Sequence, residues 1–325
     1  MIFLQIFVLA AGFAALVKGA DIFVDGSAGL AHRFRIPSLV IGLTIVAFGT
    51  SLPELAVSTT AAMQGANEIA LSNVVGSNIF NLLGVLGICA IICPVPVDLP
   101  VLRRDFPLSI STTLLTLIVV VVPVVLGGTL FSLGMEDTAG VVSMPLAVIL
   151  LAVFAAYLTY LIVDAKKNPV QEEEHASGPL WKDLVFIAGG LVLVIAGGKA
   201  VVYSAQKIAM ACGMSETLIG LTIIAIGTSL PELVTSIVAS RKGETALAVG
   251  NVIGSNIFNL LFILGISAVI HPVSVNAASV YDLAILLCIT VVSFIFSLTG
   301  KTIRRTEGIC MLLLYGTATV FAIMR

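Results

Sequence analysis

The sequence predicts an all-α polytopic membrane protein, with ten transmembrane helices arranged as two inverted five-helix repeats. Three observations predict this fold. The chain of 325 residues is 59% hydrophobic and only 10% charged, whereas soluble domains are nearer half apolar and a quarter charged. Apolar runs of about 20 residues, the length that crosses a bilayer, follow one another along the chain. Two motifs recur at one offset, 178 residues.

Ten segments have the length and composition of membrane-spanning helices. They cover about residues 2–28, 37–63, 68–93, 105–127, 142–163, 182–206, 215–240, 244–270, 279–299 and 306–324. The first lacks a basic start, so we interpret it as a span and not as a cleaved signal. The longest polar connection separates spans five and six. The predicted organisation is a first repeat over 1–164, a cytoplasmic linker over 165–181 and an inverted second repeat over 182–325.

Basic residues are distributed unevenly between the two sides of the predicted bundle. The connections after spans one, three, five, seven and nine hold 12 Lys and Arg, whereas the opposite side holds only Lys207 and Arg325. Because cytoplasmic loops carry the excess of basic residues, both termini are expected outside the cytoplasm. The predicted location is the inner (plasma) membrane.

Charge and cysteine content exclude several classes of function. The net charge of -2 gives no nucleic-acid-binding footprint. The five cysteines lack the spacing of a thiolate metal site or an exposed disulfide framework, so we expect small buried apolar residues. We predict no cofactor and no obligate protein partner.

The repeated motifs indicate duplication of a whole half. Residues 41–55, "IGLTIVAFGTSLPEL", match 219–233, "IGLTIIAIGTSLPEL", at thirteen of fifteen positions. Residues 73–83, "NVVGSNIFNLL", match 251–261, "NVIGSNIFNLL", at ten of eleven. Because each half holds five spans, an odd number, the second half enters the membrane upside down. Inverted repeats are typical of secondary transporters, which bind substrate near the midplane.

The first motif places a proline and an acid inside an apolar run. Pro53 has no N–H, so the Gly49 carbonyl loses its helical partner, and a bound cation could replace it. A simple packing kink is the alternative. Glu54 and Glu232 occupy matching positions, where a membrane-embedded charge costs roughly 2.5–3.5 kcal/mol. Without a basic neighbour, the pair should hold protons or cations; two protonated acids bonded to each other are the structural alternative.

The second motif supplies further oxygen atoms. Asn73, Ser77 and Asn81 are four residues apart and share one helix face, and Asn251, Ser255 and Asn259 repeat it. Such small polar residues also promote close helix packing in membranes. All candidate donors in the two motifs are hard oxygens, which excludes a soft-metal site and favours Ca²⁺ or Na⁺. Two carboxylates match one divalent or two monovalent ions, and competition for the same oxygens is a mechanism of exchange.

The duplicated "GTSLPEL" and "GNVIGSNIFN" motifs resemble those of the calcium/cation antiporter superfamily, specifically the prokaryotic sodium/calcium exchangers. The resemblance covers essentially the whole chain. It implies four clustered cation sites around Glu54 and Glu232, with a calcium site completed by the Thr50 and Thr228 backbone carbonyls. The implied sodium sites add the carbonyls of Ala47 and Ala225, the hydroxyls of Ser51, Ser229, Ser77 and Ser255, and the amides of Asn81 and Asn259.

The resemblance also implies that spans one and six slide across a rigid core to switch access. One position departs from the pattern, because some members carry Asp where this chain has Asn259. The site therefore holds two carboxylates and not three. That difference leaves stoichiometry, potassium dependence and the physiological ion open.

The predicted function is secondary active exchange of Ca²⁺ for Na⁺. A proton- or sodium-coupled carrier of another cation and a cation channel are the alternatives, with H⁺ or K⁺ as further candidate ions. An intramembrane enzyme is not expected, because His32, His175 and His271 lie in or near connections.

Four charged residues of spans one and six have no assigned role. Lys18 and Asp21 are three residues apart and could pair. Asp25 is a candidate for an external vestibule. Lys199 has no partner nearby in sequence and is expected to extend its amine towards the membrane surface.

Overall fold

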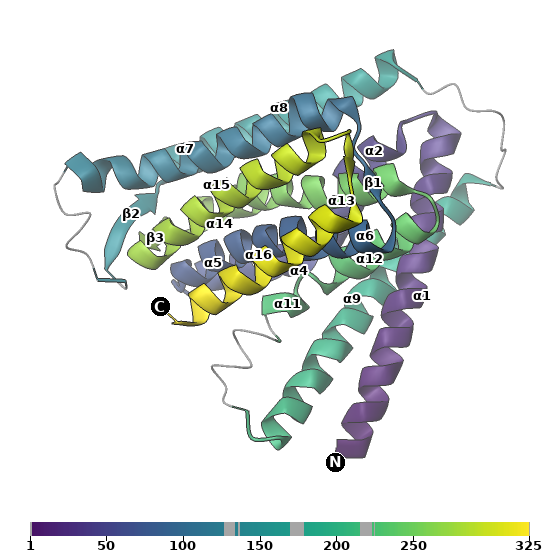
Figure 1. Ribbon diagram of the computed structural model, residues 1–325, viewed down its shortest axis with the longest axis horizontal. Helices are drawn as coiled ribbons and strands as arrows, with labels where there is room; N and C mark the ends of the chain where they lie inside the picture. The colour runs from purple at the N-terminus through teal and green to yellow at the C-terminus, as the bar shows by residue number, and fades with distance from the viewer. Residues whose placement is uncertain are drawn as a thin grey trace.

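The computed structural model describes residues 2–126, 134–135, 137–169, 179–214, 223 and 225–324. Its architecture is helical, with four short strands in the connections. Two long helices, α1 (Ile2–Phe34) and α9 (Leu180–Ala211), lie side by side and lean away from the remaining helices (Figure 1). The described elements therefore form a helix pair and a larger bundle.

The first half of the bundle consists of interrupted helices followed by longer continuous ones. Its elements are α2 (Ser38–Ile41), η1 (Gly42–Val46), α3 (Ala47–Thr50), α4 (Leu52–Met63), α5 (Asn67–Ile79), η2 (Phe80–Val85), α6 (Leu86–Ile92), β1 (Val95–Pro96), η3 (Val101–Asp105), α7 (Phe106–Leu126), β2 (Thr138–Val142) and α8 (Met144–Lys167), where η denotes a π-helical turn.

The second half repeats this order after α9. Its described elements are α11 (Ala225–Gly227), α12 (Leu230–Arg241), α13 (Thr245–Phe258), η5 (Asn259–Ile263), α14 (Leu264–Ile270), β3 (Val273–Asn276), α15 (Ala277–Leu298), β4 (Thr302–Ile303) and α16 (Arg305–Met324). The motif residues 219–222 and 224 and most of the central linker lie outside the described residues.

Seven helices of the described chain are long and apolar enough to cross a membrane, and an eighth is counted if the bent pair Ser38–Thr50 and Leu52–Met63 is one span. This confirms the all-helical membrane class. The seven do not include α16, where we predicted a span over 306–324, or α12, whose predicted span 215–240 is only partly described.

The break in the bent pair lies where the sequence places Pro53. Helix α3 ends at Thr50, Ser51 adopts φ −85° and ψ 9°, and α4 starts again at Leu52 after a bend of 50°. The second half repeats the break: Ser229 has φ −94° and ψ 10°, and α12 begins beside Pro231. Because proline cannot donate to the preceding turn, each helix is interrupted immediately before its glutamate.

The interior of the bundle lies around α5 and α13. In the apolar windows of Ile69–Ile92 and Thr245–Ile270, 72% and 78% of residues are buried, compared with 17% in α1 and 28% in α9. Helices α5 and α13 therefore form the core, and the α1–α9 pair exposes most of its surface to the lipid expected around it.

Close packing joins α1 to α9. A Cβ atom at Gly19 would lie 2.7 Å from the Leu193 Cβ atom, and one at Gly190 would lie 2.6 Å from the Phe23 nitrogen. Small residues allow such close approach between membrane helices. At the end of the pair, Arg33 Nε donates to Asp183 Oδ2 at 2.9 Å. The two helices are thus fastened to each other along their length.

Two small sheets join the halves. Strand β1 pairs antiparallel with β4, placing Val95 opposite Ile303. Strand β2 pairs antiparallel with β3, placing Val142 opposite Val273. Each sheet therefore takes one strand from each half.

The cysteines depart partly from the sequence expectation. Cys89 is buried as predicted, but Cys212, Cys288 and Cys310 are exposed. The expectation of burial was wrong for these three because an apolar run identifies a membrane helix without identifying which of its faces points outward. All five thiols are free.

Candidate functional site

The two glutamates of the repeated motif are fully buried in the centre of the bundle. Glu54 lies in the first turn of α4, and Glu232 lies in the first turn of α12. The helix break thus sets each carboxylate directly after an interrupted turn. Within the described ranges, no group of three or more His, Cys, Asp and Glu residues is placed to hold a metal ion.

Hydrogen bonds crossing between the halves bring the two acids together. Ser51 Oγ donates to Glu232 Oε1 at 2.8 Å, and Ser229 Oγ donates to Glu54 Oε1 at 2.9 Å. Ser77 Oγ adds a longer contact to Glu54 Oε1 at 3.4 Å. Each carboxylate is therefore held by the serine that precedes the other.

The asparagines at the start of the second motif support the backbone beside each acid. Asn73 Nδ2 donates to the Glu54 carbonyl at 3.2 Å and to Ser58 Oγ at 2.9 Å.

The second half repeats these contacts. Asn251 Nδ2 donates to the Glu232 carbonyl at 3.4 Å and to Ser236 Oγ at 2.9 Å. Sequence reasoning missed Ser58 and Ser236, although both follow their glutamate by four residues and could have been found on the same helix face.

Thr50 also joins the halves. Its Oγ1 donates to the Val46 carbonyl at 3.1 Å and lies 3.0 Å from Asn251 Oδ1. Thr50 ends α3, and Thr228 follows α11, so both threonines lie at the breaks. The carbonyls that lose their helical partner to Pro53 and Pro231 belong to Gly49 and Gly227, the residues directly before these threonines.

Several buried oxygens around the acids lack any hydrogen-bond partner. Buried polar atoms are normally paired, so an unpaired set requires an explanation. Those belonging to predicted site residues are Glu54 Oε2, Glu232 Oε2, Thr228 Oγ1, Ser255 Oγ, Asn81 Oδ1 and Asn259 Oδ1. These are hard donors of the kind that Ca²⁺ and Na⁺ prefer. The cluster has the chemistry to bind such a cation.

The alanines of the predicted set are less directly connected. The Ala47 carbonyl accepts the Ser51 N–H at 3.1 Å, so it takes part in the turn before the break. Ala225 begins α11, and its side chain lies outside the described part of the structure. Ala47 is buried.

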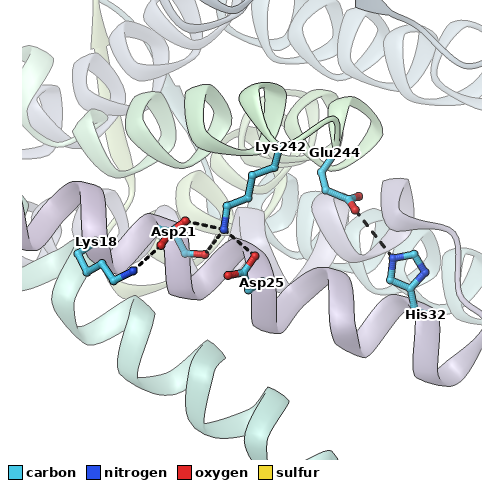
Figure 2. Close-up of polar contacts among 6 residues, drawn as sticks. All are labelled: Lys18, Asp21, Asp25, His32, Lys242 and Glu244. Carbon is cyan, nitrogen blue, oxygen red and sulfur yellow. Dashed lines mark hydrogen bonds and ion pairs between the residues drawn. The ribbon is translucent and has the colours of Figure 1, made fainter. Parts of the chain in front are cut away.

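A separate charged cluster fastens α1 to the tip of the α12–α13 hairpin (Figure 2). Lys242 Nζ lies 2.5 Å from Asp21 Oδ1 and 2.6 Å from Asp25 Oδ1, and it donates to the Asp21 carbonyl at 2.9 Å. Lys18 Nζ pairs with Asp21 Oδ2 at 2.6 Å, as its spacing suggested. His32 Nε2 lies 3.9 Å from Glu244 Oε1.

The environment of Lys242 favours its charged form. Partial burial opposes the charge, but the hydrogen bonds to Asp21 and Asp25 outweigh it and raise the pKa of Lys242 above its ordinary value. Asp25 therefore pairs with the connection between α12 and α13. The count of basic residues predicts that this connection is cytoplasmic, so that prediction and the external vestibule expected for Asp25 exclude each other. Its partner is 217 residues away, beyond the reach of local sequence reasoning.

A cavity of about 710 Å³ lies between α9, α4 and the break before α12. Its described lining includes the polar residues Gln64, Lys199, Tyr203, Gln206 and Thr228. Lys199 is exposed and lines this space, and the extension of its amine towards the membrane surface stays a prediction. Because Thr228 belongs to the predicted site, the cavity reaches the edge of the oxygen cluster.

The chain matches known proteins over nearly its whole length. A family profile described as "Sodium/calcium exchanger protein" matches residues 4–163 and 182–324. The sodium/calcium exchanger MaX1 of Methanosarcina acetivorans is 31% identical, with 97% of each chain covered. The inner membrane protein YrbG of Escherichia coli is 37% identical, covering 87% of this chain and 86% of YrbG.

The fold is also similar to a solved structure. The sodium-calcium exchanger NCX_Mj, soaked with Na⁺ and Ca²⁺, matches with a TM-score of 0.82 and 30% identity, covering 98% of this chain and 99% of NCX_Mj. These matches in sequence and in fold show that the chain is a prokaryotic calcium/cation antiporter of the sodium/calcium exchanger family.

Proposed function

We propose that this protein exchanges Ca²⁺ for Na⁺ across the membrane at a site between Glu54 and Glu232. The observation that carries the proposal is the crossed pair of serine–glutamate hydrogen bonds, which leaves Oε2 of each acid buried without a partner. Two carboxylates balance one divalent or two monovalent cations, so the two ions compete for the same charge.

The proposed ligand set is the one that the sequence predicts. The two acids and the carbonyls of Thr50 and Thr228 would bind Ca²⁺. Na⁺ would use the acids together with further hydroxyl, amide and carbonyl oxygens, contributed by Ser51, Ser229, Ser77, Ser255, Asn81, Asn259, Ala47 and Ala225. The unpaired oxygens of Ser255, Asn81 and Asn259 support this division.

The proposed architecture is ten spans in two inverted repeats, with the linker over 165–181 and both termini outside the cytoplasm of the inner membrane. Two kinds of observation support it. The cross-half sheets pair the connection after span three with that after span nine, and the connection after span four with that after span eight. In a ten-span chain, each of these pairs lies on one side of the membrane.

Access to the site would alternate by movement of the α1–α9 pair. The tight glycine packing and the Arg33–Asp183 pair make the two helices one unit. One face of this unit is tied to the bundle by Lys242 beside a cavity of about 590 Å³, and a cavity of about 710 Å³ lined by Lys199 lies at the other. A breakable restraint beside one of two cavities is what an alternating-access carrier would use to switch sides.

A carrier of another cation is the second candidate. It is favoured by Asn81 and Asn259, which give the site two neutral amides at matching positions and no third carboxylate. H⁺ or K⁺ could then take part in the exchange.

The decisive experiment is ⁴⁵Ca²⁺ uptake into proteoliposomes loaded with Na⁺, so that sodium leaves as calcium enters. We expect uptake that depends on the sodium gradient and is abolished in Glu54→Gln and Glu232→Gln, because each substitution removes half of the charge at the site. Glu307→Gln is the matched control, since this acid is half-buried and accepts a hydrogen bond from Thr299 at 2.5 Å, outside the site. Full activity in either site variant would reject the site, and uptake without sodium dependence would favour the second candidate.

A further inference from the structure

Two asparagines, Asn78 and Asn256, lie next to the predicted ligands on their helices and occupy equivalent positions in the two halves. They hydrogen-bond each other where the halves meet. Asn78 Nδ2 donates to the Asn256 carbonyl, and Asn256 Nδ2 donates to the Asn78 carbonyl, both at 3.2 Å. Both side chains are buried. This reciprocal contact packs α5 against α13 at the centre of the bundle.

These two hydrogen bonds determine the direction in which each side-chain amide presents its oxygen to other neighbours. A carboxamide carries its oxygen and its nitrogen on the same carbon, so engaging Nδ2 fixes the direction of Oδ1. Each of the two asparagines therefore presents its Oδ1 acceptor in a fixed direction to its remaining neighbours, beside the second N–H of Nδ2. A neighbour can satisfy that acceptor only by donating a hydrogen.

The two halves differ at this next contact. Asn259 Nδ2 donates to Asn78 Oδ1 at 3.0 Å. The equivalent atoms, Asn81 Nδ2 and Asn256 Oδ1, have no partner. The Asn259 amide is thus held by a hydrogen bond, whereas neither the oxygen nor the nitrogen of the equivalent Asn81 amide has a partner.

The fixed amide belongs to a predicted ligand. With Nδ2 bound to Asn78, the Asn259 oxygen must point away from it, and this Oδ1 is buried without a partner. Ser255, one turn earlier on the same helix face, also has an unpaired oxygen. The two oxygens therefore belong to one face of α13–η5.

We propose that Asn78 is a positioning residue that orients the Asn259 amide so that its oxygen, and not its NH₂ group, faces the transported cation. This inference rests on the proposed cation site. A cation cannot bind the NH₂ end, so an amide that no hydrogen bond fixes, such as that of Asn81, loses rotational freedom when it becomes a ligand. Asn78 removes that cost for Asn259, because a ligand held in its bound orientation loses less entropy on binding. The site is preorganised in one half only.

The competing explanation is that Asn78 serves only to pack helices. Asn256 provides the matched control, because Asn78→Ala and Asn256→Ala each remove one 3.2 Å cross-half hydrogen bond from a buried asparagine. Only Asn78→Ala also releases Asn259. A packing role predicts equal effects, whereas a positioning role predicts unequal ones.

The test measures the half-saturating Na⁺ and Ca²⁺ concentrations and the maximal rate of exchange in proteoliposomes. We expect Asn78→Ala to raise the half-saturating concentration of at least one ion about fivefold, the size of a lost hydrogen bond. Asn256→Ala should leave both within about twofold of the wild-type value, and the Asn78→Ala maximal rate should stay similar to that of Asn256→Ala. Equal shifts in the two variants would overturn the inference.

Two further variants make the test independent of any loss of folding. Asn78→Asp retains an acceptor for Asn259, so it should not raise the half-saturating concentrations; a rise as large as in Asn78→Ala would overturn the inference. Combining Asn78→Ala with Asn259→Ala should add nothing to Asn259→Ala alone, since Asn78 acts through that residue. If wild-type protein shows no exchange or Glu54→Gln remains active, the proposed function fails instead, which keeps the two failures distinguishable.

Discussion

The two faces of the α1–α9 pair are related by the 178-residue repeat but differ in chemistry. On one face, Asp21 and Asp25 of α1 bind Lys242; we call this the Lys242 face. The repeat relates Asp21, Asp25 and Lys242 to Lys199, Tyr203 and Gln64, in that order. These three counterparts line the cavity of about 710 Å³, and we call them the Gln64 face.

An acid–acid–base set and a base–tyrosine–glutamine set thus occupy equivalent places in one scaffold. Opposite charges tie the helix pair to the bundle at the Lys242 face, while Gln64 brings no charge to meet Lys199. A cavity borders each face, of about 590 Å³ at Lys242 and about 710 Å³ at Gln64, so the two faces differ in the ion pairs that cross them and not in whether a cavity is present.

Reversing the charge of residue 242 should change the difference in accessibility between the two faces more than any other variant proposed here. In Lys242→Glu, three carboxylates would meet where an ammonium now joins two, and like charges at close range repel strongly. We expect α1 to separate from the hairpin tip. A cysteine at Val238, on α12 near that tip, should react about tenfold faster with a membrane-impermeant thiol reagent, equivalent to about 1.4 kcal/mol.

The matched reporter is a cysteine at Thr60, which lines the cavity and is related to Val238 by the repeat. Both reporters require a background in which the five native cysteines are replaced. Thr60→Cys should react more slowly in Lys242→Glu than in the parent. If the ratio of the two labelling rates stays constant, the ion pairs do not hold the face closed.

Neutralising the same residue should have an intermediate effect. Lys242→Gln gives the Lys242 face the residue found at Gln64, removing the ion pairs without adding repulsion. Because partly exposed ion pairs contribute about 0.2–1 kcal/mol each, we expect labelling at Val238→Cys to rise about threefold. Lys18→Gln is the control, since it removes a charge from the same cavity while the ion pair that it breaks, with Asp21, lies within α1. An equal rise in both variants would contradict a cross-helix role for Lys242.

Adding a charge to the Gln64 face should give the smallest change. In Gln64→Glu, a carboxylate would share the cavity with Lys199 and could form the pair that the native face lacks. We expect labelling at Thr60→Cys to slow about twofold, the effect of one exposed ion pair. The slowing should disappear when Lys199→Gln is combined with it; persistence in the double variant would show that the new acid acts without Lys199.

Much of the site was predictable from sequence because its signals are local. Proline interrupts a helix through its own missing N–H, so the breaks before Glu54 and Glu232 follow from Pro53 and Pro231. The equal offsets of the two motifs predicted that both acids occupy equivalent positions. Their complete burial confirms that these are interior positions.

The contacts that join the halves were not predictable in the same way. Ser51 and Glu232 are 181 residues apart, and Lys242 and Asp25 are 217 apart. The sequence suggested no partner for Asp25. It also gave no reason to expect Asn78 to bind Asn259 while Asn256 and Asn81 remain without the equivalent contact.

Residue type and spacing within one helix are enough to predict a helical membrane protein built from a duplicated unit, with an interrupted helix and a buried acid in each half. The contacts between each serine and the opposite glutamate, the fixed amide of Asn259 and the ion pairs of Lys242 became visible in the folded chain. A hydrogen bond or an ion pair acts over about 3 Å, and packing is what brings distant residues to that separation.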